Sequence, residues 1–220
     1  MSKQKNAKLV LLLCALAGLF YNSWPLGYLL NNPTAHGGLA SDLEVVGHPY
    51  FWIFILGDVL TGLSLIIVFL TFRIKLWPKL NTKALKFTLL GLLIFGAFTI
   101  ISALLPSECS VTPILRCGAD QGRGLGLDAL TSAIAAIGLL VSLISVNSYA
   151  RSNKSHHLVQ IFTTLSLLIW SFAGLLFIVF AVSSGNAHLT QQIYLILSGL
   201  SLLLVGLNLN IVANNSKEIS

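Results

Sequence analysis

The sequence predicts an all-α membrane protein in which six transmembrane helices form one bundle spanning residues 1–220 as a single domain. First, 55% of the residues are hydrophobic and only 9% are charged, whereas a soluble domain carries about 25% charged residues. Second, apolar runs of about 20 residues recur, which is the length that crosses a hydrocarbon core about 30 Å thick. Third, lysine and arginine are concentrated in the short segments between these runs.

The first predicted span, residues 9–30, follows the basic segment MSKQKNAK. This beginning imitates a signal peptide, but the apolar run continues and no convincing small-residue cleavage site follows it. We therefore expect the segment to remain in the protein as its first span.

Five further apolar runs complete the predicted bundle. They are residues 51–72, 85–105, 127–146, 158–182 and 191–212. Backbone amides inside a bilayer have no water to bind, so each run is expected to be helical. The fourth run carries Ala129, Ala133, Ala136 and Gly138, which favours a closely packed central helix.

Charge placement predicts the orientation of the bundle. Eleven of the 13 basic residues flank the spans on one side, and Arg116 and Arg123 lie on the other. The eleven are Lys3, Lys5, Lys8, Arg73, Lys75, Lys79, Lys83, Lys86, Arg151, Lys154 and Lys217. Basic side chains next to a span resist translocation, so both termini are predicted to be cytosolic.

Composition also limits the function classes and partners. The net charge of +6 comes from loop residues rather than from one basic face, so we expect membrane lipids as partners and no nucleic acid. A membrane-protein partner or a second copy of the chain is also compatible with the small-residue face. The three cysteines form no CxxC pair, and the sequence predicts no cofactor and no metal. Cys109 and Cys117, separated by seven residues in an exterior loop, are predicted to form a disulfide.

Asp58 is the first candidate site residue because it lies about eight residues into the second span. A carboxylate at the centre of a transmembrane helix costs roughly 2.5 to 3.5 kcal/mol on insertion scales. Two interpretations remain open. Asp58 is either a proton carrier, ligand or general base in an outward cavity, or a carboxylic acid that hydrogen-bonds to a neighbouring helix.

Asp128 opens the fourth span, and Thr131 and Ser132 follow it on the same helical face. With Asp58, it forms a candidate acid–base pair, and Ser132 is a candidate binding residue. The alternative for Asp128 is a purely structural cap, because an acidic residue at a helix N-terminus stabilises free N–H groups and the helix dipole.

The exterior segment before the second span adds further candidate binding residues, namely Asp42, Glu44 and His48. Along a continuous helix His48 would lie about 15 Å from Asp58, too far for contact. We expect instead that the loop folds back over the mouth of the bundle and brings Asp42 or Glu44 towards the two aspartates.

Short motifs resemble a known family. The stretch from Ser41 to Trp52, the sequence Gly57-Asp58-Val59-Leu60-x-Gly62, Leu105-Pro106 and the later cysteines are similar to the bacterial and archaeal family called domain of unknown function 998. The resemblance covers nearly the whole chain. It implies a six-helix fold in a bacterial or archaeal cell (inner) membrane, with no established activity.

The sequence leaves three functions open. The first is a non-catalytic protein that scaffolds, regulates or assembles a partner, with a polar site facing outwards between the second and fourth spans. The second is a hydrolase or transferase acting on a lipid or envelope substrate at the outer leaflet. The third is a small proton-coupled transporter with Asp58 on the proton route.

Overall fold

The computed structural model describes residues 3–32, 35, 38–46, 49–75, 82–105, 123–152, 157–183 and 187–215. Within these ranges the ordered elements are all helices, and no strand occurs. The long helices are α1 (Lys3–Tyr21), α3 (Phe51–Lys75), α4 (Lys83–Leu104), α5 (Arg123–Ser152), α6 (His157–Ser183) and α7 (His188–Asn215). The short helices are α2 (Leu26–Leu29) and the 3₁₀ helix η2 (Ala40–Glu44).

Five helices of the described chain, α3 to α7, are long and apolar enough to cross a membrane. They extend the second to sixth predicted spans by a few residues and confirm them as helices. In each helix, at most 44% of the most apolar 18-residue segment is buried within the bundle. Most of this apolar surface therefore needs an apolar solvent. The chain is therefore an all-helical protein of the multi-pass membrane type.

The prediction of one continuous first span over residues 9–30 is wrong. Helix α1 ends at Tyr21, and the separate helix α2 begins after Pro25, which has no backbone N–H to continue a helix. The side-chain amide of Asn22 also donates to the Gly18 carbonyl at 2.9 Å and so provides a partner for a carbonyl group in the last turn of the helix. Three lysines stand in the first turns of α1, and α1 is not among the five helices with membrane-span composition.

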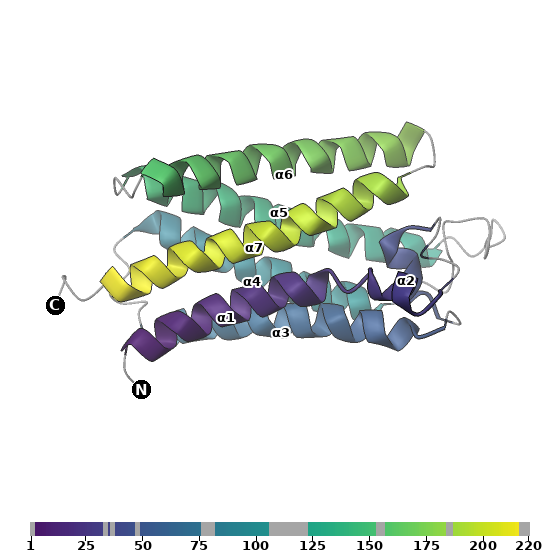
Figure 1. The fold of residues 1–220 in the computed structure, drawn as a ribbon, viewed down its shortest axis with the longest axis horizontal. Coiled ribbons are helices and arrows are strands. Elements are labelled where there is room, and N and C mark those ends of the chain that lie inside the picture. The colour runs from purple at the N-terminus through teal and green to yellow at the C-terminus, as the bar shows by residue number, and fades with distance from the viewer. Residues whose placement is uncertain are drawn as a thin grey trace.

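The long helices form a closed ring in chain order. Helix α1 packs on α3, α3 on α4, α4 on α5, α5 on α6 and α6 on α7, and α7 returns to pack on α1 (Figure 1). Neighbouring helices run antiparallel, as short connections require. Of the five apolar helices, α6 is the least enclosed, with 17% of its most apolar 18-residue segment buried.

Glycines allow α4 and α5 to approach closely. A Cβ atom built on Gly138 would lie 2.7 Å from the backbone nitrogen of Phe95 and 2.9 Å from the carbonyl oxygen of Gly91. A Cβ atom on Gly91 would lie 2.5 Å from the carbonyl oxygen of Gly138. The two backbones therefore touch at a crossing that tolerates no side chain on either helix.

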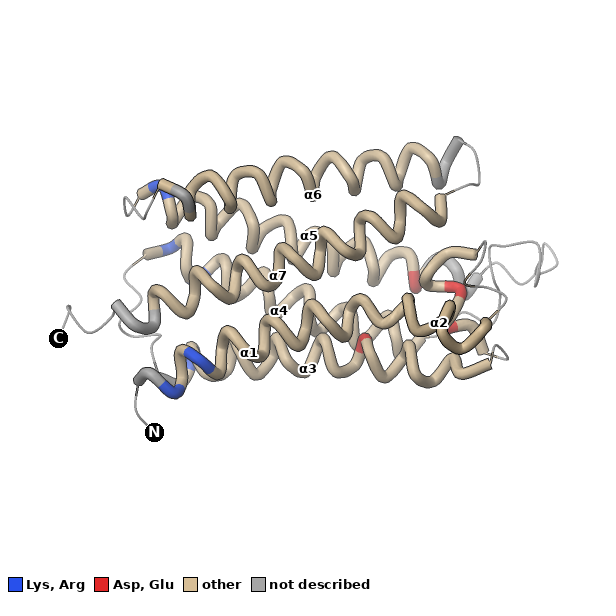
Figure 2. Tube along the Cα trace, viewed as in Figure 1, with Lys and Arg blue, Asp and Glu red and all other residues tan. Residues whose placement is uncertain are grey.

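Charged side chains separate to opposite ends of the bundle (Figure 2). Apart from Arg123, which begins α5 at the opposite end, the described lysines and arginines lie at the end that holds both chain termini, and the described carboxylates lie in the other half. Those carboxylates are Asp42, Glu44, Asp58 and Asp128. We call these two ends the basic end and the acidic end.

Candidate functional site

A cavity of about 690 Å³ occupies the half of the bundle nearer the acidic end. Its wall takes residues from the end of α1, from η2 and from every other long helix of the ring. This volume lies within the 300 to 1,000 Å³ that is usual for small-molecule sites. The cavity is thus large enough for a ligand and is enclosed by the helices that carry the candidate residues.

Three carboxylates line this cavity, each from a different element: Glu44 from η2, Asp58 from α3 and Asp128 from α5. Helices α3 and α5 both begin at the acidic end, because each is antiparallel to α4 (Figure 1). Asp58 lies two turns into α3 and Asp128 lies in the second turn of α5, so the two aspartates lie at comparable depth from this end. The loop before α3 folds back as expected, and it brings Glu44 to the same wall.

Asp128 is held by a short chain of hydroxyl groups. The hydroxyl of Ser102, in the last turn of α4, donates to a carboxylate oxygen of Asp128. The hydroxyl oxygens of Ser102 and Ser132 are 3.0 Å apart. Because the single proton of Ser102 goes to Asp128, Ser132 must be the donor to Ser102. The predicted residues Asp128 and Ser132 are therefore joined through Ser102.

Asp58 and Glu44 differ from Asp128, because within the described residues neither of them accepts a hydrogen bond. The nearest hydroxyl on α3, that of Thr61, donates to the backbone carbonyls of Gly57 and Ala17 instead. Both carboxylates face the cavity, so their oxygens remain available to a ligand.

Electrostatics at Glu44 follow from this placement. Burial raises the pKa of Glu44 well above its ordinary value, and the charges of Asp58 and then Asp128 raise this pKa further. Like charges that share one enclosed space oppose each other's ionisation, so the cavity attracts either protons or a cationic group.

The raised pKa of Glu44 predicts a pH dependence of stability. The folded chain binds the Glu44 proton more tightly than the unfolded chain, so this contribution is complete below about pH 4.5 and is lost as the pH rises through the raised pKa. We expect Glu44→Gln to reduce the fall of the thermal unfolding midpoint between pH 4.5 and pH 8, measured in detergent. An unchanged slope in the variant would contradict the placement of Glu44.

Asp42 has a different position from the other candidates. Its side chain is 3% exposed, it does not line the cavity, and its carboxylate accepts the backbone N–H of Leu39 at 2.9 Å. This bond stabilises the first turn of η2. Asp42 therefore positions the segment that carries Glu44.

The remaining predicted residues lie outside the described ranges. These are His48 and the disulfide pair Cys109 and Cys117. Within the described part of the chain, no group of three His, Cys, Asp or Glu side chains could hold a metal ion.

Aromatic and apolar side chains of α6 and α7 form another wall of the cavity. Trp170 of α6 and Tyr194 of α7 pack with ring centroids 5.3 Å apart, and Phe177 stacks on Tyr194 at 6.1 Å. The indole nitrogen of Trp170 donates to the hydroxyl of Ser198 at 2.8 Å. The indole N–H of Trp170 is therefore hydrogen-bonded, and the faces of the aromatic rings are apolar.

The segment η2 covers the acidic end and is fixed there by α7. The backbone N–H of Ala40 donates to the side-chain oxygen of Gln191 at 2.6 Å, and the amide of Gln191 donates to the hydroxyl of Ser41 at 3.4 Å. Beside them, Gln192 donates to the hydroxyl of Tyr28 at 3.1 Å. The start of α7 thus holds η2 over the cavity.

Sequence reasoning missed Ser102, Trp170, Tyr194 and Gln191 as cavity residues. A serine near the end of an apolar run, an aromatic ring in a span and a glutamine at a span boundary are each common. The contacts that distinguish these four residues are between elements and not within one, and that of Gln191 reaches back to Ala40 in η2.

Comparison with models of known families, with curated proteins and with solved structures gave no match. The resemblance to the domain of unknown function 998 family therefore stays a prediction, and the function rests on the cavity itself.

Proposed function

We propose that the chain is a six-span protein of a bacterial or archaeal cell membrane, with both termini in the cytosol. The five apolar helices support this, as does the position of α1, which completes the ring between α3 and α7. At 19 residues α1 is about 28 Å long, close to the thickness of a hydrocarbon core. The basic end then faces the cytosol and the acidic end faces outwards.

In this orientation, the protein binds an amphiphilic ligand at the outer leaflet. The observation that carries the proposal is the shared cavity, which has three carboxylates from η2, α3 and α5 and an apolar, aromatic wall from α6 and α7. Such a two-part lining suits a molecule with a cationic or hydrogen-bond-donating headgroup and an apolar chain. Binding without chemistry would serve a regulatory, scaffolding or assembly function in the membrane.

The headgroup is expected to be an amine. The described lining of the cavity contains no lysine, arginine or histidine that could neutralise the three carboxylates. A protonated amine can donate up to three hydrogen bonds, and Asp58 and Glu44 accept none from the described residues. An anionic headgroup would be repelled by the same three groups.

A binding assay on the purified protein in nanodiscs tests the proposal. A single-chain amine amphiphile is titrated against a phosphate-headed amphiphile with the same chain, and binding is measured by calorimetry or native mass spectrometry. We expect saturable binding of the amine compound and none of the phosphate compound. Equal partitioning of both compounds into discs with and without the protein would overturn it.

A second candidate function, acid–base chemistry on the bound lipid, is favoured by the unequal surroundings of the two aspartates. Asp128 accepts a hydrogen bond from Ser102, whereas Asp58 accepts none within the described chain. Different surroundings of this kind are typical of a general acid and a general base that work together. Recovery of the amphiphile unchanged after long incubation with the protein would leave binding as the function.

A further inference from the structure

The cavity reaches the side of the bundle between the outer halves of α5 and α6. Three of its lining side chains are more than half exposed, Ile137 of α5 and Leu175 and Ile178 of α6, at 58% each. All three lie within the apolar spans of their helices. Side chains that line a cavity and are also this exposed mark a lateral opening, and here the opening faces the region of the acyl chains.

Hydrogen bonds tie α6 to its neighbours in its inner half and at its centre. Thr163 and Thr164 both donate to the side-chain oxygen of Asn147 on α5, at 3.3 and 3.0 Å. Ser166 pairs with Ser201 at 2.9 Å, and Trp170 donates to Ser198, both on α7. These bonds anchor the centre of α6, and its half nearer the basic end, to α5 and α7.

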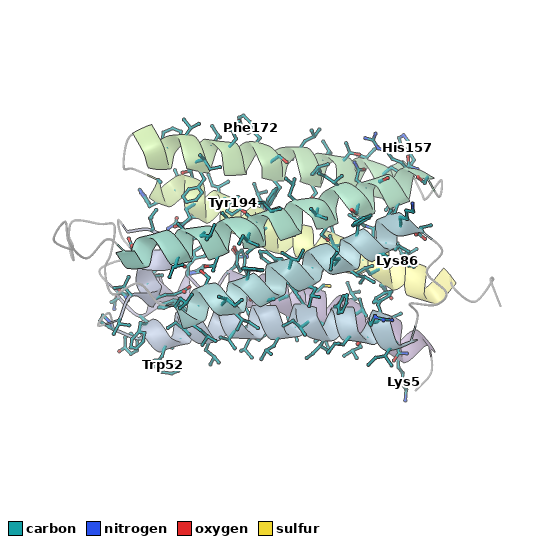
Figure 3. All side chains as sticks on the ribbon, turned by 180° about the vertical axis from the view of Figure 1, so that it is seen from behind. Lys5, Trp52, Lys86, His157, Phe172 and Tyr194 are labelled. Atoms are coloured by element: carbon teal, nitrogen blue, oxygen red, sulfur yellow. The ribbon has the colours of Figure 1, made fainter. Side chains whose placement is uncertain are left out.

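The two helices also diverge towards the acidic end. Figure 3 shows α5 and α6 closest near His157 and farther apart towards the opposite end, with Tyr194 of α7 in view between them. On α5 four of the seven side chains that line the cavity are small, namely Ala129, Ser132, Ala133 and Ala136. Small side chains on one helix and an anchored, diverging partner produce the lateral opening.

We propose that this opening is a port between α5 and α6 through which the apolar chain of the ligand reaches the cavity from the outer leaflet. The inference rests on the proposed function and specifies its ligand as a membrane-dissolved molecule with one slender chain. The headgroup lies at the carboxylates, and the chain lies along the aromatic wall and reaches Trp170, which is 5% exposed and so is shielded from bulk lipid.

Fluorescence of Trp170 tests this placement directly. The other tryptophans, Trp24, Trp52 and Trp77, are replaced by phenylalanine, and the protein is studied in nanodiscs. The probe is a single-chain amine amphiphile that carries bromine near the end of its chain. We expect a saturable loss of Trp170 emission that follows the binding curve, because bromine quenches an indole ring only on close approach.

A variant that fills the port tests whether the chain enters the cavity there. Ala133→Phe, in the same single-tryptophan protein, places a ring in the space between α5 and α6, so quenching should be lost. Butylamine, which has the headgroup but almost no chain, is titrated against the parent single-tryptophan protein to show that the carboxylates bind the amine without a chain. Quenching that survives Ala133→Phe would overturn the port, because the chain would then reach Trp170 by another route.

The outcomes separate the two proposals. If the amine probe binds saturably without quenching Trp170, the ligand site stands and the port is wrong. If neither the amine probe nor butylamine binds, the proposed function itself fails, and the port fails with it. Circular dichroism of the variants before each titration shows that a lost signal reflects the port and not an unfolded bundle.

Discussion

Asp58→Asn is expected to weaken binding of a single-chain amine amphiphile by about 2 kcal/mol or more, which is roughly a 30-fold rise in Kd. Asp58 faces the cavity from α3, and within the described chain it accepts no hydrogen bond that the headgroup would have to displace. Asparagine keeps the shape of the side chain but removes the charge. The loss is measured by calorimetry on protein in nanodiscs.

Stability should change in the opposite direction. An intramembrane carboxylate is costly to insert, so its replacement by an amide should leave the thermal unfolding midpoint unchanged or raise it. A binding loss combined with unchanged or higher stability cannot be explained by damage to the fold. Equal Kd values for the variant and the wild type would show that Asp58 is a structural carboxylic acid rather than a ligand-binding one.

Asp42→Asn is the matched control for this experiment. Asp42 is also an aspartate near the acidic end, but it caps η2 and does not line the cavity. Asparagine retains a side-chain oxygen that can accept the Leu39 N–H. Binding should therefore stay close to the wild-type value, which separates an effect at the cavity from a general effect of negative charge.

The second large effect is expected from Gly138→Leu, which should lower the free energy of unfolding by about 3 kcal/mol, at the upper end of overpacking costs. The first atom of the new side chain would meet backbone atoms of Phe95 and Gly91, which cannot move without shifting α4 as a whole. The measurement is thermal or denaturant unfolding of the detergent-solubilised protein, read by near-UV circular dichroism.

Ala133→Leu shows whether the effect of Gly138→Leu comes from the close contact with α4 or from any larger side chain on α5. Ala133 lies on the same helix, five residues earlier, but it lines the cavity and has room for a larger side chain. This variant should remain about as stable as the wild type and should lose affinity for the amphiphile. Similar destabilisation by both substitutions would mean that α5 packs tightly along its whole length and that the cavity is absent.

The sequence was sufficient to predict helices α3 to α7 and the two cavity carboxylates that these helices carry. Asp58 and Asp128 stand out because ionisable groups inside apolar runs are rare. The end of α1 could not be placed, because an apolar run that continues past Tyr21 conceals the local effect of Asn22 and Pro25. Composition alone therefore overestimated the length of the first helix.

The remaining parts of the site depend on tertiary contacts that leave no local pattern. Asp42 and Glu44 are two residues apart in one loop, yet Asp42 caps a helix and Glu44 reaches the cavity. The turn of a 3₁₀ helix decides which of them points inwards. In the same way, nothing near Ser102 in the sequence indicates that its hydroxyl binds a carboxylate on the next helix.

The closure of the ring has a consequence for biosynthesis. Helix α1 leaves the ribosome first, but one of its two neighbours in the ring, α7, is made last. Helix α7 also supplies Gln191 and Tyr194, which hold η2 in place and complete the aromatic wall. Contacts this distant in sequence form late and slowly. Until α7 inserts, the three carboxylates stand beside an unfinished bundle, so a chain that stalls before α7 exposes them and is a natural substrate for membrane quality control.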